Sequence, residues 1–308
     1  MSEACPVCGS ADLKPQGDYR GTHPAFLEMK RARCLTCEMV FATPMPSEFA
    51  LHQFNASYFT TAHGGHLQSR AGTAFFSAIA RLRGAHLDRY LLSHATTVSR
   101  VLELGPGTGF FARNWLENHP STIYTAIETD SSCHASLAKL GVRLVEDVAA
   151  HGASESVDLV VMSHVLEHVS NPRQFLSDST RNLRKGGAVF IEVPCRDCEH
   201  KSMDEPHLLF FDKAPMKYLL HKFNFGDIEV SYHGQEIAKL RTASNFKALI
   251  TALRAKIINW GFSAPFGHMR PGMECLSDPL ERAAIAPYLA HRESLKPSWW
   301  LRVLATKR

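Results

Sequence analysis

The sequence predicts an α/β domain with a mostly parallel sheet, preceded by a small metal-binding module, and three observations lead to this prediction. Apolar strands alternate with helical segments from about residue 99 to residue 194, which is typical of a parallel sheet with helices on both faces. The segment Val101–Phe111 (VLELGPGTGFF) has the pattern of a buried strand, a glycine-rich turn and a helix start. Two CxxC pairs lie near the N-terminus.

Length and composition set the limits of this prediction. With 308 residues, 45% hydrophobic and 21% charged, the chain can hold one α/β domain and a small accessory module. The N-terminus shows no basic segment followed by an apolar one, and no run of about 18 apolar residues indicates a membrane span. We therefore expect a cytoplasmic protein without a membrane partner.

The charge is distributed unevenly. The formal net charge is +4; residues 1–45 carry five Lys/Arg and five Asp/Glu, whereas residues 239–308 carry twelve against four. Solvated helix faces would explain this excess, and an anionic substrate is the sharper interpretation.

The two cysteine pairs predict a structural zinc site. Cys5 and Cys8 form one CxxC pair and Cys34 and Cys37 form the other, with 25 residues between them. Four thiolates at this spacing can close a tetrahedral site, and redox-active dithiols are the alternative. We predict a zinc ribbon over residues 1–45 with a hairpin inserted between the pairs. Its balanced charge argues against a phosphate-binding role, so we expect it to be structural or to wall a cleft.

Residues 46–95 are expected to be a linker followed by N-terminal helices. Tyr58, His63 and His66 lie in the linker, where they either reach an active site or are exposed polar residues. Apolar residues recur at helical spacing from about Ser69 to His94, which predicts a helix interrupted near Gly84.

The glycine-rich turn is the first indication of a cofactor. Gly105, Gly107 and Gly109 follow an apolar strand that contains Glu103, but Phe110 stands where a dinucleotide-binding fingerprint has its third glycine. The pattern Glu-x-Gly-x-Gly-x-Gly resembles motif I of the class I S-adenosylmethionine (SAM) methyltransferases. On this resemblance Glu103 and the three glycines are expected to bind SAM.

The resemblance extends over residues 99–194. Glu128 ends the next predicted strand and is placed to accept the ribose hydroxyls of the cofactor. Asp147 and Val148 follow the third strand and are expected at the adenine. Ser163 lies in the fourth strand and is also expected to bind the cofactor. The resemblance implies a Rossmann-like fold over residues 96–308, with a mostly parallel seven-stranded sheet, an antiparallel last strand and an insertion at 234–297. From the sequence pattern, strands are expected at 123–128, 143–147, 157–165, 188–193, 227–233 and 299–306, and helices at 131–140, 172–184, 212–222 and 245–260.

The run after the fourth strand supplies acid–base candidates: His164, Glu167 and His168. It resembles the Glu-x-x-Glu-His run that holds a divalent metal in ubiquinone-pathway O-methyltransferases and small-RNA 2′-O-methyltransferases. Here His164 replaces the first Glu, which suits a softer ion than Mg²⁺. Similar runs are common in metal-free class I enzymes, where they hold local structure, and we favour that interpretation.

A second candidate region follows the fifth strand. The stretch EPHLLFF (205–211) resembles a segment of zinc-ribbon sugar C-methyltransferases in which a histidine faces the transferred methyl group. His207 is therefore our leading general base, and a histidine that caps a helix or fills a lid is the less favoured alternative. Cys195 and Cys198, with His200 nearby, are interpreted as reduced cysteines lining the cleft rather than as a second zinc site.

These motifs predict SAM-dependent methyl transfer to a small molecule, a secondary metabolite or sugar derivative, in natural product biosynthesis. The related sugar enzymes carry a further C-terminal domain beyond the last core strand, so O- or N-methylation is at least as well supported as C-methylation. An RNA or tRNA methyltransferase is the first alternative, but no Asn/Asp-Pro-Pro-Tyr/Phe motif follows the fourth strand. A non-catalytic adaptor with the same fold is the second. Oligomeric state does not follow from the sequence.

Overall fold

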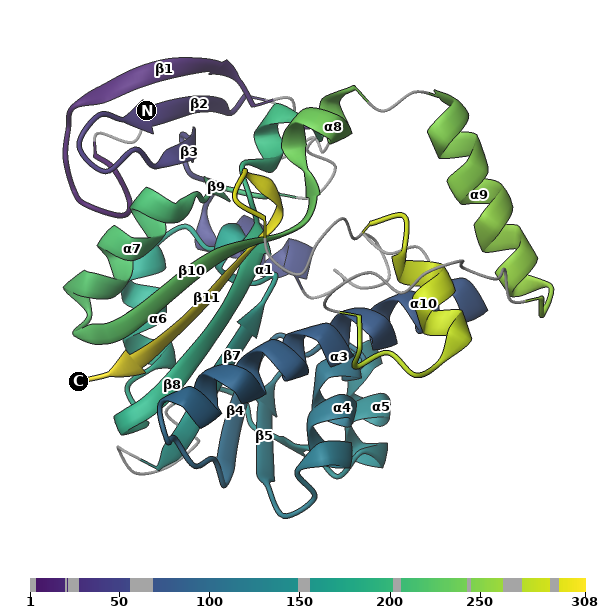
Figure 1. The fold of residues 1–308 in the computed structure, drawn as a ribbon. Coiled ribbons are helices and arrows are strands. Elements are labelled where there is room, and N and C mark those ends of the chain that lie inside the picture. The colour runs from purple at the N-terminus through teal and green to yellow at the C-terminus, as the bar shows by residue number, and fades with distance from the viewer. Residues whose placement is uncertain are drawn as a thin grey trace.

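Two β-sheets organise the chain in the computed structural model (Figure 1). The structure describes residues 4–19, 21, 28–55, 69–148, 156–201, 206–242, 245–262, 273–288 and 294–308. The candidate residues Tyr58, His63 and His66 lie outside these ranges. A seven-stranded sheet forms the centre of the molecule, and a four-stranded sheet lies at the N-terminal end.

The large sheet has the strand order β10-β11-β8-β7-β4-β5-β6. Its strands are β4 (Arg100–Leu104), β5 (Ile123–Ile127), β6 (Arg143–Leu144), β7 (Val157–Ser163), β8 (Leu183–Pro194), β10 (Phe225–Glu236) and β11 (Ser298–Lys307). β11 runs antiparallel to both of its neighbours, whereas the pairs from β8 to β6 are parallel. The predicted mostly parallel seven-stranded sheet with an antiparallel last strand is confirmed.

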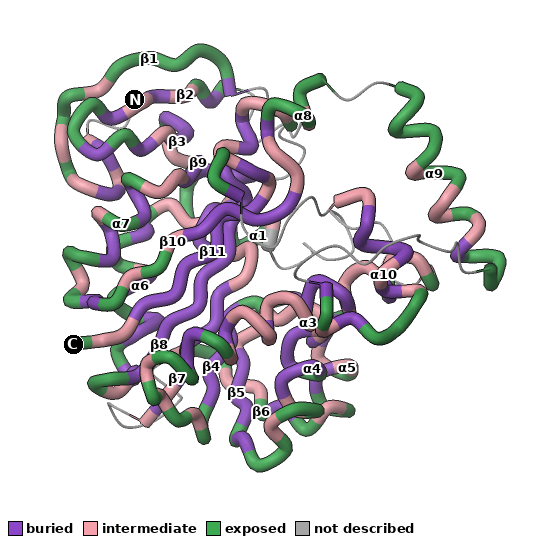
Figure 2. Tube along the Cα trace, viewed as in Figure 1, coloured by how far each residue is buried: buried purple, intermediate pink, exposed green. Residues whose placement is uncertain are grey.

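Helices cover both faces of this sheet because alternate strand residues point to opposite sides. Leu102 of β4 packs into the core on one side with α6 (Pro172–Ser179) and α7 (Lys213–Lys222). Val101 packs on the other side with α3 (Arg70–Ser93), α4 (Phe110–Asn118) and α5 (His134–Lys139), which follows the short helix η3 (Ser131–Cys133). Figure 2 shows the buried strands between these exposed helix surfaces.

Two details of the predicted helices are wrong. α3 continues through Gly84, where a Cβ atom would lie 2.5 Å from the Asn114 side chain, so this glycine permits close packing against α4 rather than a break. α6 ends at Ser179 instead of extending to 184, because β8 already begins at Leu183. Gly186 and Gly187 consequently lie within the strand.

The small sheet joins distant parts of the sequence. Its order is β1 (Leu13–Asp18), β2 (Lys30–Cys34), β3 (Val40–Thr43) and β9 (Leu209–Phe210). β1 and β2 form the expected antiparallel hairpin between the cysteine pairs. β9 belongs to the stretch after His207 and pairs antiparallel with β3, so the N-terminal sheet is completed by a segment of the larger domain.

The remaining helices are α1 (Glu48–Asn55) and, between β10 and β11, α8 (Ile237–Arg241), α9 (Asn245–Asn259) and α10 (Pro279–Ile285). α9 was expected from the amphipathic pattern. A search of the described helices finds none that is long and apolar enough to span a bilayer.

Candidate active site

The glycine-rich turn after β4 has a backbone that requires glycine. Gly105, Gly107 and Gly109 have φ values of 64°, 57° and 83°, which side chains other than glycine rarely tolerate. A Cβ atom on Gly105 would lie 2.8 Å from Val165, and one on Gly109 would lie 2.8 Å from Leu140. The turn therefore presents backbone directly at the edge where the parallel strands end.

Glu128 connects this turn to the end of β5. One carboxylate oxygen accepts a 2.8 Å hydrogen bond from the Gly107 amide, and the other accepts a 2.9 Å bond from the Asp130 amide. Burial raises the pKa of Glu128, although these two amide bonds partly oppose the rise. Each oxygen keeps a further lone pair, as the expected pair of bonds from ribose hydroxyls requires.

Glu103 is buried more deeply than a side chain whose only role is to contact a ligand. It is 2% exposed, and its carboxyl accepts a 2.7 Å hydrogen bond from the Tyr124 hydroxyl of β5. Burial raises its pKa to about 7. Sequence reasoning missed Tyr124, which reads as an ordinary apolar strand residue.

The other expected cofactor residues lie along the same edge of the sheet. Asp147 and Val148 follow β6, where Asp147 is exposed and the Val148 carbonyl accepts a 2.9 Å hydrogen bond from Asn182. Ser163 is the last residue of β7, and its buried hydroxyl has no hydrogen-bond partner among the described residues. The strand order places these positions on either side of the glycine turn.

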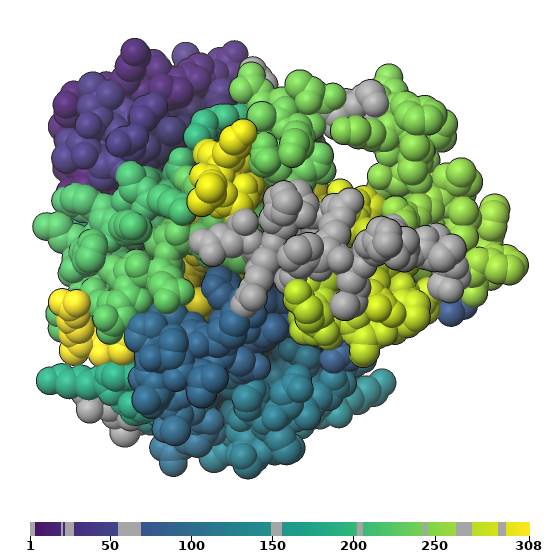
Figure 3. All heavy atoms as spheres, in the orientation of Figure 1, coloured from purple at the N-terminus to yellow at the C-terminus, as the bar shows by residue number. Residues whose placement is uncertain are grey.

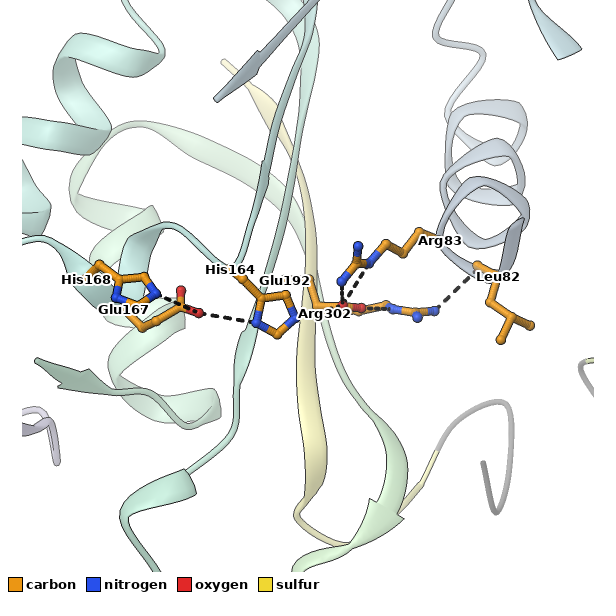
Figure 4. Close-up of polar contacts among 7 residues, drawn as sticks. All are labelled: Leu82, Arg83, His164, Glu167, His168, Glu192 and Arg302. Atoms are coloured by element: carbon orange, nitrogen blue, oxygen red, sulfur yellow. Dashed lines mark hydrogen bonds and ion pairs between the residues drawn. The ribbon is translucent and has the colours of Figure 1, made fainter. Parts of the chain in front are cut away.

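His164 bridges two buried carboxylates (Figure 4). Its Nδ1 lies 3.3 Å from Glu167, and its Nε2 lies 3.5 Å from Glu192. The residue has a left-handed backbone, with φ of 58°, which turns the chain away from β7. Burial opposes the charged form of His164, but its bonds to the two carboxylates outweigh burial and raise its pKa. Its side chain is 35% exposed, whereas that of Glu167 is 1% exposed.

Two arginines complete this cluster, and sequence reasoning missed both of them and Glu192. The Glu192 carboxylate is fully buried; Arg83 of α3 donates to it at 2.8 Å, and Arg302 of β11 also donates to it. Figure 4 shows both guanidinium groups meeting Glu192 beside His164. The sequence did contain a signal for this pair, because Glu192 interrupts an apolar run in β8 and Arg302 interrupts one in β11. The two residues lie opposite each other in the paired strands.

His207 faces a buried carboxylate. Its Nδ1 lies 2.5 Å from Asp197, and the two residues are 3% and 1% exposed. Burial alone would raise the pKa of Asp197, but the charge and hydrogen bond of His207 outweigh it and lower that pKa. The rings of His207 and His168 meet edge to face with centroids 4.7 Å apart. Asp197 was not among the predicted site residues, because it lies in a stretch with several acids.

Two groups of side chains are arranged as metal ligands would be. The four sulfur atoms of the CxxC pairs lie within 4.8 Å of one another, with Cys5–Cys37 and Cys8–Cys34 separations of 3.6 and 3.4 Å. These separations are close to the edge of about 3.8 Å in a tetrahedron with zinc–sulfur bonds of ~2.3 Å. The predicted ligand set therefore fits zinc.

The second group was only partly predicted. Glu167, His168 and His207 place one ligand atom each within 4.8 Å of the others. Apart from His164, whose Nδ1 lies 3.3 Å from one oxygen of Glu167, no described residue satisfies this buried carboxylate. His164, which the sequence pattern grouped with them, lies outside this set. Cys195 and Cys198 are buried and belong to neither group of described residues; burial raises the pKa of Cys198 to about 11.

Comparison with known proteins identifies the family. The model of a family described as a methyltransferase domain matches residues 69–250, which is more than half of the chain. Malonyl-[acyl-carrier protein] O-methyltransferase of Paenibacillus sp. (strain JDR-2) is 32% identical over 104 residues, covering 30% of this chain and 38% of that protein. Ubiquinone biosynthesis O-methyltransferase of Parvibaculum lavamentivorans is 30% identical over 98 residues, covering 30% and 39%. The chain thus spans less than half the length of these curated relatives.

A solved structure agrees at the level of the fold. The phosphoethanolamine N-methyltransferase 2 of Haemonchus contortus, solved with phosphomonomethylethanolamine and S-adenosylhomocysteine, has a TM-score of 0.51 at 17% identity. The likeness covers 87% of this chain and 62% of that one. The family match over residues 69–250 shows that the chain belongs to the methyltransferase domain family.

Proposed function

We propose that the protein transfers the methyl group of SAM to a small-molecule acceptor, a secondary metabolite or sugar derivative, in the cytoplasm, with His207 as general base. The observation that carries the proposal is the buried pair of His207 and Asp197, with Nδ1 and Oδ2 2.5 Å apart. A carboxylate that holds Nδ1–H fixes the tautomer in which Nε2 accepts a proton, and it stabilises the imidazolium that results.

The cofactor assignment rests on the edge of the sheet. Gly105, Gly107 and Gly109 would let the backbone approach SAM, Glu128 would accept the ribose hydroxyls, and Asp147 with Val148 would contact the adenine. Glu103 and Ser163 would border the same ligand. When bound, SAM would supply a methyl group on a sulfonium for in-line transfer to the acceptor atom, with S-adenosylhomocysteine as the leaving group. The contribution of the chain is to align the acceptor and to remove a proton from it.

His164 is the second candidate base. Its side chain is 35% exposed and is therefore more accessible to an acceptor than that of His207, which is 3% exposed. Its pairing with two carboxylates favours the protonated ring, which accepts no further proton. We therefore assign His164 and Glu167 the task of shaping the acceptor side of the site. His168 packs against the ring of His207 and would hold it in place.

Three observations support the proposed class of acceptor. The relatives named above are methyltransferases of small or carrier-bound acceptors by their names. Residues 1–45 have balanced charge and are therefore poorly suited to hold a nucleic-acid backbone. The excess of Lys/Arg in residues 239–308 favours an anionic acceptor. RNA methylation is the alternative, and RNA binding that weakens steeply with salt would support it instead.

Calorimetry and single-turnover assays test the proposal together. The wild-type protein should bind S-adenosylhomocysteine; no binding would leave only the adaptor interpretation. His207→Ala should keep this affinity and lose turnover by about 10²-fold or more, measured with a panel of hydroxyl and amine acceptors. His164→Ala is the comparison: if it loses more turnover than His207→Ala, the base is His164.

A further inference from the structure

Helix α9 exposes a continuous apolar stripe. Four members recur at positions i, i+3, i+4 and i+7 and lie on one side of the helix, and the fifth is a tryptophan directly after its last residue. They are Phe246, Leu249, Ile250, Leu253 and Trp260, with 68%, 64%, 46%, 53% and 70% of their surface exposed. We call these five residues the α9 stripe. So many exposed large apolar side chains in one row need a partner.

The opposite side of α9 holds the helix on the protein. Ile258 is 1% exposed and packs with Ala74 of α3 and Ala283 of α10. The Asn259 side chain accepts a 2.9 Å hydrogen bond from the Ala71 amide. Both contacts lie near the C-terminal end of α9, and the helix stands at the edge of the molecule (Figure 3). The stripe is therefore exposed on a helix that is anchored to the domain at one end.

The charge around the stripe has one sign. Residues 237–273 contain six Lys/Arg and no Asp/Glu. Within α9, Lys247 lies along one border of the stripe and Lys256 along the other, as the helical spacing of 100° per residue requires. Lys239 and Arg241 of α8 precede them. A partner that fits this surface has an apolar interior for the stripe and an anionic surface for the bordering cations.

We propose that α9 binds the surface of an anionic lipid bilayer, lying in the plane of the interface. Aromatic and leucine side chains on one face, with cations at the borders, are the pattern of helices that lie on membranes. A second copy of this chain is a poorer fit, because pairing the stripe with itself would bring the bordering cations together. The expectation that the protein has no membrane partner rested on the lack of a spanning segment, which does not bear on a helix that lies on the surface.

Co-sedimentation with vesicles tests this inference. The full-length protein should sediment with vesicles of phosphatidylcholine mixed with phosphatidylglycerol at least tenfold more strongly than with phosphatidylcholine alone, and added salt should weaken this binding. Leu253→Asp should reduce it at least tenfold. Leu92→Asp is the matched control, since Leu92 is 83% exposed on α3 away from the stripe, and it should bind as the wild type does.

Two further variants keep the test decisive if Leu253→Asp perturbs the helix. Lys247→Glu combined with Lys256→Glu leaves the stripe intact and should abolish the preference for anionic vesicles. Trp260 should shift its fluorescence to shorter wavelength on vesicle binding, and Trp260→Phe should remove that shift. Equal binding to neutral and anionic vesicles, or none to either, would overturn the proposal. So would a concentration-dependent dimer in sedimentation velocity that Leu253→Asp dissociates.

Discussion

The hydroxyl of Tyr19 donates a 2.9 Å hydrogen bond to the main-chain carbonyl of His207. This bond joins the cysteine-rich N-terminal sheet to the segment of the candidate base. The next residue in that segment continues the connection, because the Leu208 carbonyl accepts a 2.8 Å bond from the Ala42 amide. β9 then pairs with β3. The N-terminal sheet therefore holds the backbone on which His207 is mounted.

Tyr19→Phe should slow methyl transfer as well as lower stability. Removing the hydroxyl takes away this buried hydrogen bond, which costs on the order of 1 kcal/mol, and a small displacement of His207 should reduce turnover on the order of tenfold. Tyr90→Phe is the matched control, because the Tyr90 hydroxyl donates a 2.9 Å bond to the Asp227 carbonyl away from the site. It should lower stability and leave turnover unchanged. Equal turnover in both variants would contradict a positioning role.

Zinc removal should affect the same segment from a distance. Elemental analysis should detect zinc in the wild-type protein and none in Cys34→Ser. Because structural zinc supplies much of the folding energy of such modules, residues near β1–β3 of the variant should become sensitive to protease. Loss of β3 would also release β9, so turnover should fall although cofactor affinity remains.

The number of metal ions bound per chain tests which of the two candidate ligand groups holds a metal. We expect one zinc per chain, held by Cys5, Cys8, Cys34 and Cys37. Cys198→Ser is the matched control and should keep that zinc, as should Glu167→Gln. A second equivalent of metal that disappears in Glu167→Gln would show that Glu167, His168 and His207 bind a metal, and His207 would then be a ligand rather than the base.

Asp197→Asn tests how the histidine is oriented. The amide can offer an NH₂ group to Nδ1 and so favour the wrong tautomer, which should reduce kcat by about 10²-fold or more. The affinity for S-adenosylhomocysteine, measured by calorimetry, should stay unchanged because Asp197 lies outside the glycine turn. A fall in that affinity equal to the fall in kcat would mean that the variant damages the fold of the site.

Local patterns predicted the sheet and the glycine turn well, because a strand followed by glycines with φ > 0 leaves little choice of conformation. Contacts between distant segments were not predicted in the same way. β9 has two residues, too few to show a period, and its partner β3 lies far away in the sequence. The ribbon was therefore expected only to be structural or to wall a cleft, and its contact with His207 was missed.

Buried charge was a signal that was present but unused. Glu192 and Arg302 each interrupt an apolar strand, and burying either one alone is costly, so each required a partner. Reading the two strands as neighbours would have paired them. Arg83 could not be found in this way, because it is one of several arginines on α3 and only the packing of that helix brings it to Glu192.

Glu103 should lower the stability of the folded protein by an amount that grows as pH rises. Its pKa is about 7 in the folded protein because of burial, against ~4.3 in an unfolded chain. At a pH below the pKa of the unfolded chain, the carboxyl is protonated in both states and does not change the free energy of unfolding. As pH rises from the unfolded pKa to the folded pKa, the unfolded state releases its proton first. The free energy of unfolding of the wild-type protein therefore falls, by about 3 kcal/mol once pH exceeds 7. Glu103→Gln keeps an oxygen for Tyr124 and carries no charge. Urea unfolding should therefore give equal stabilities near pH 4 and a more stable variant at pH 8, whereas a difference that does not change with pH would contradict this account.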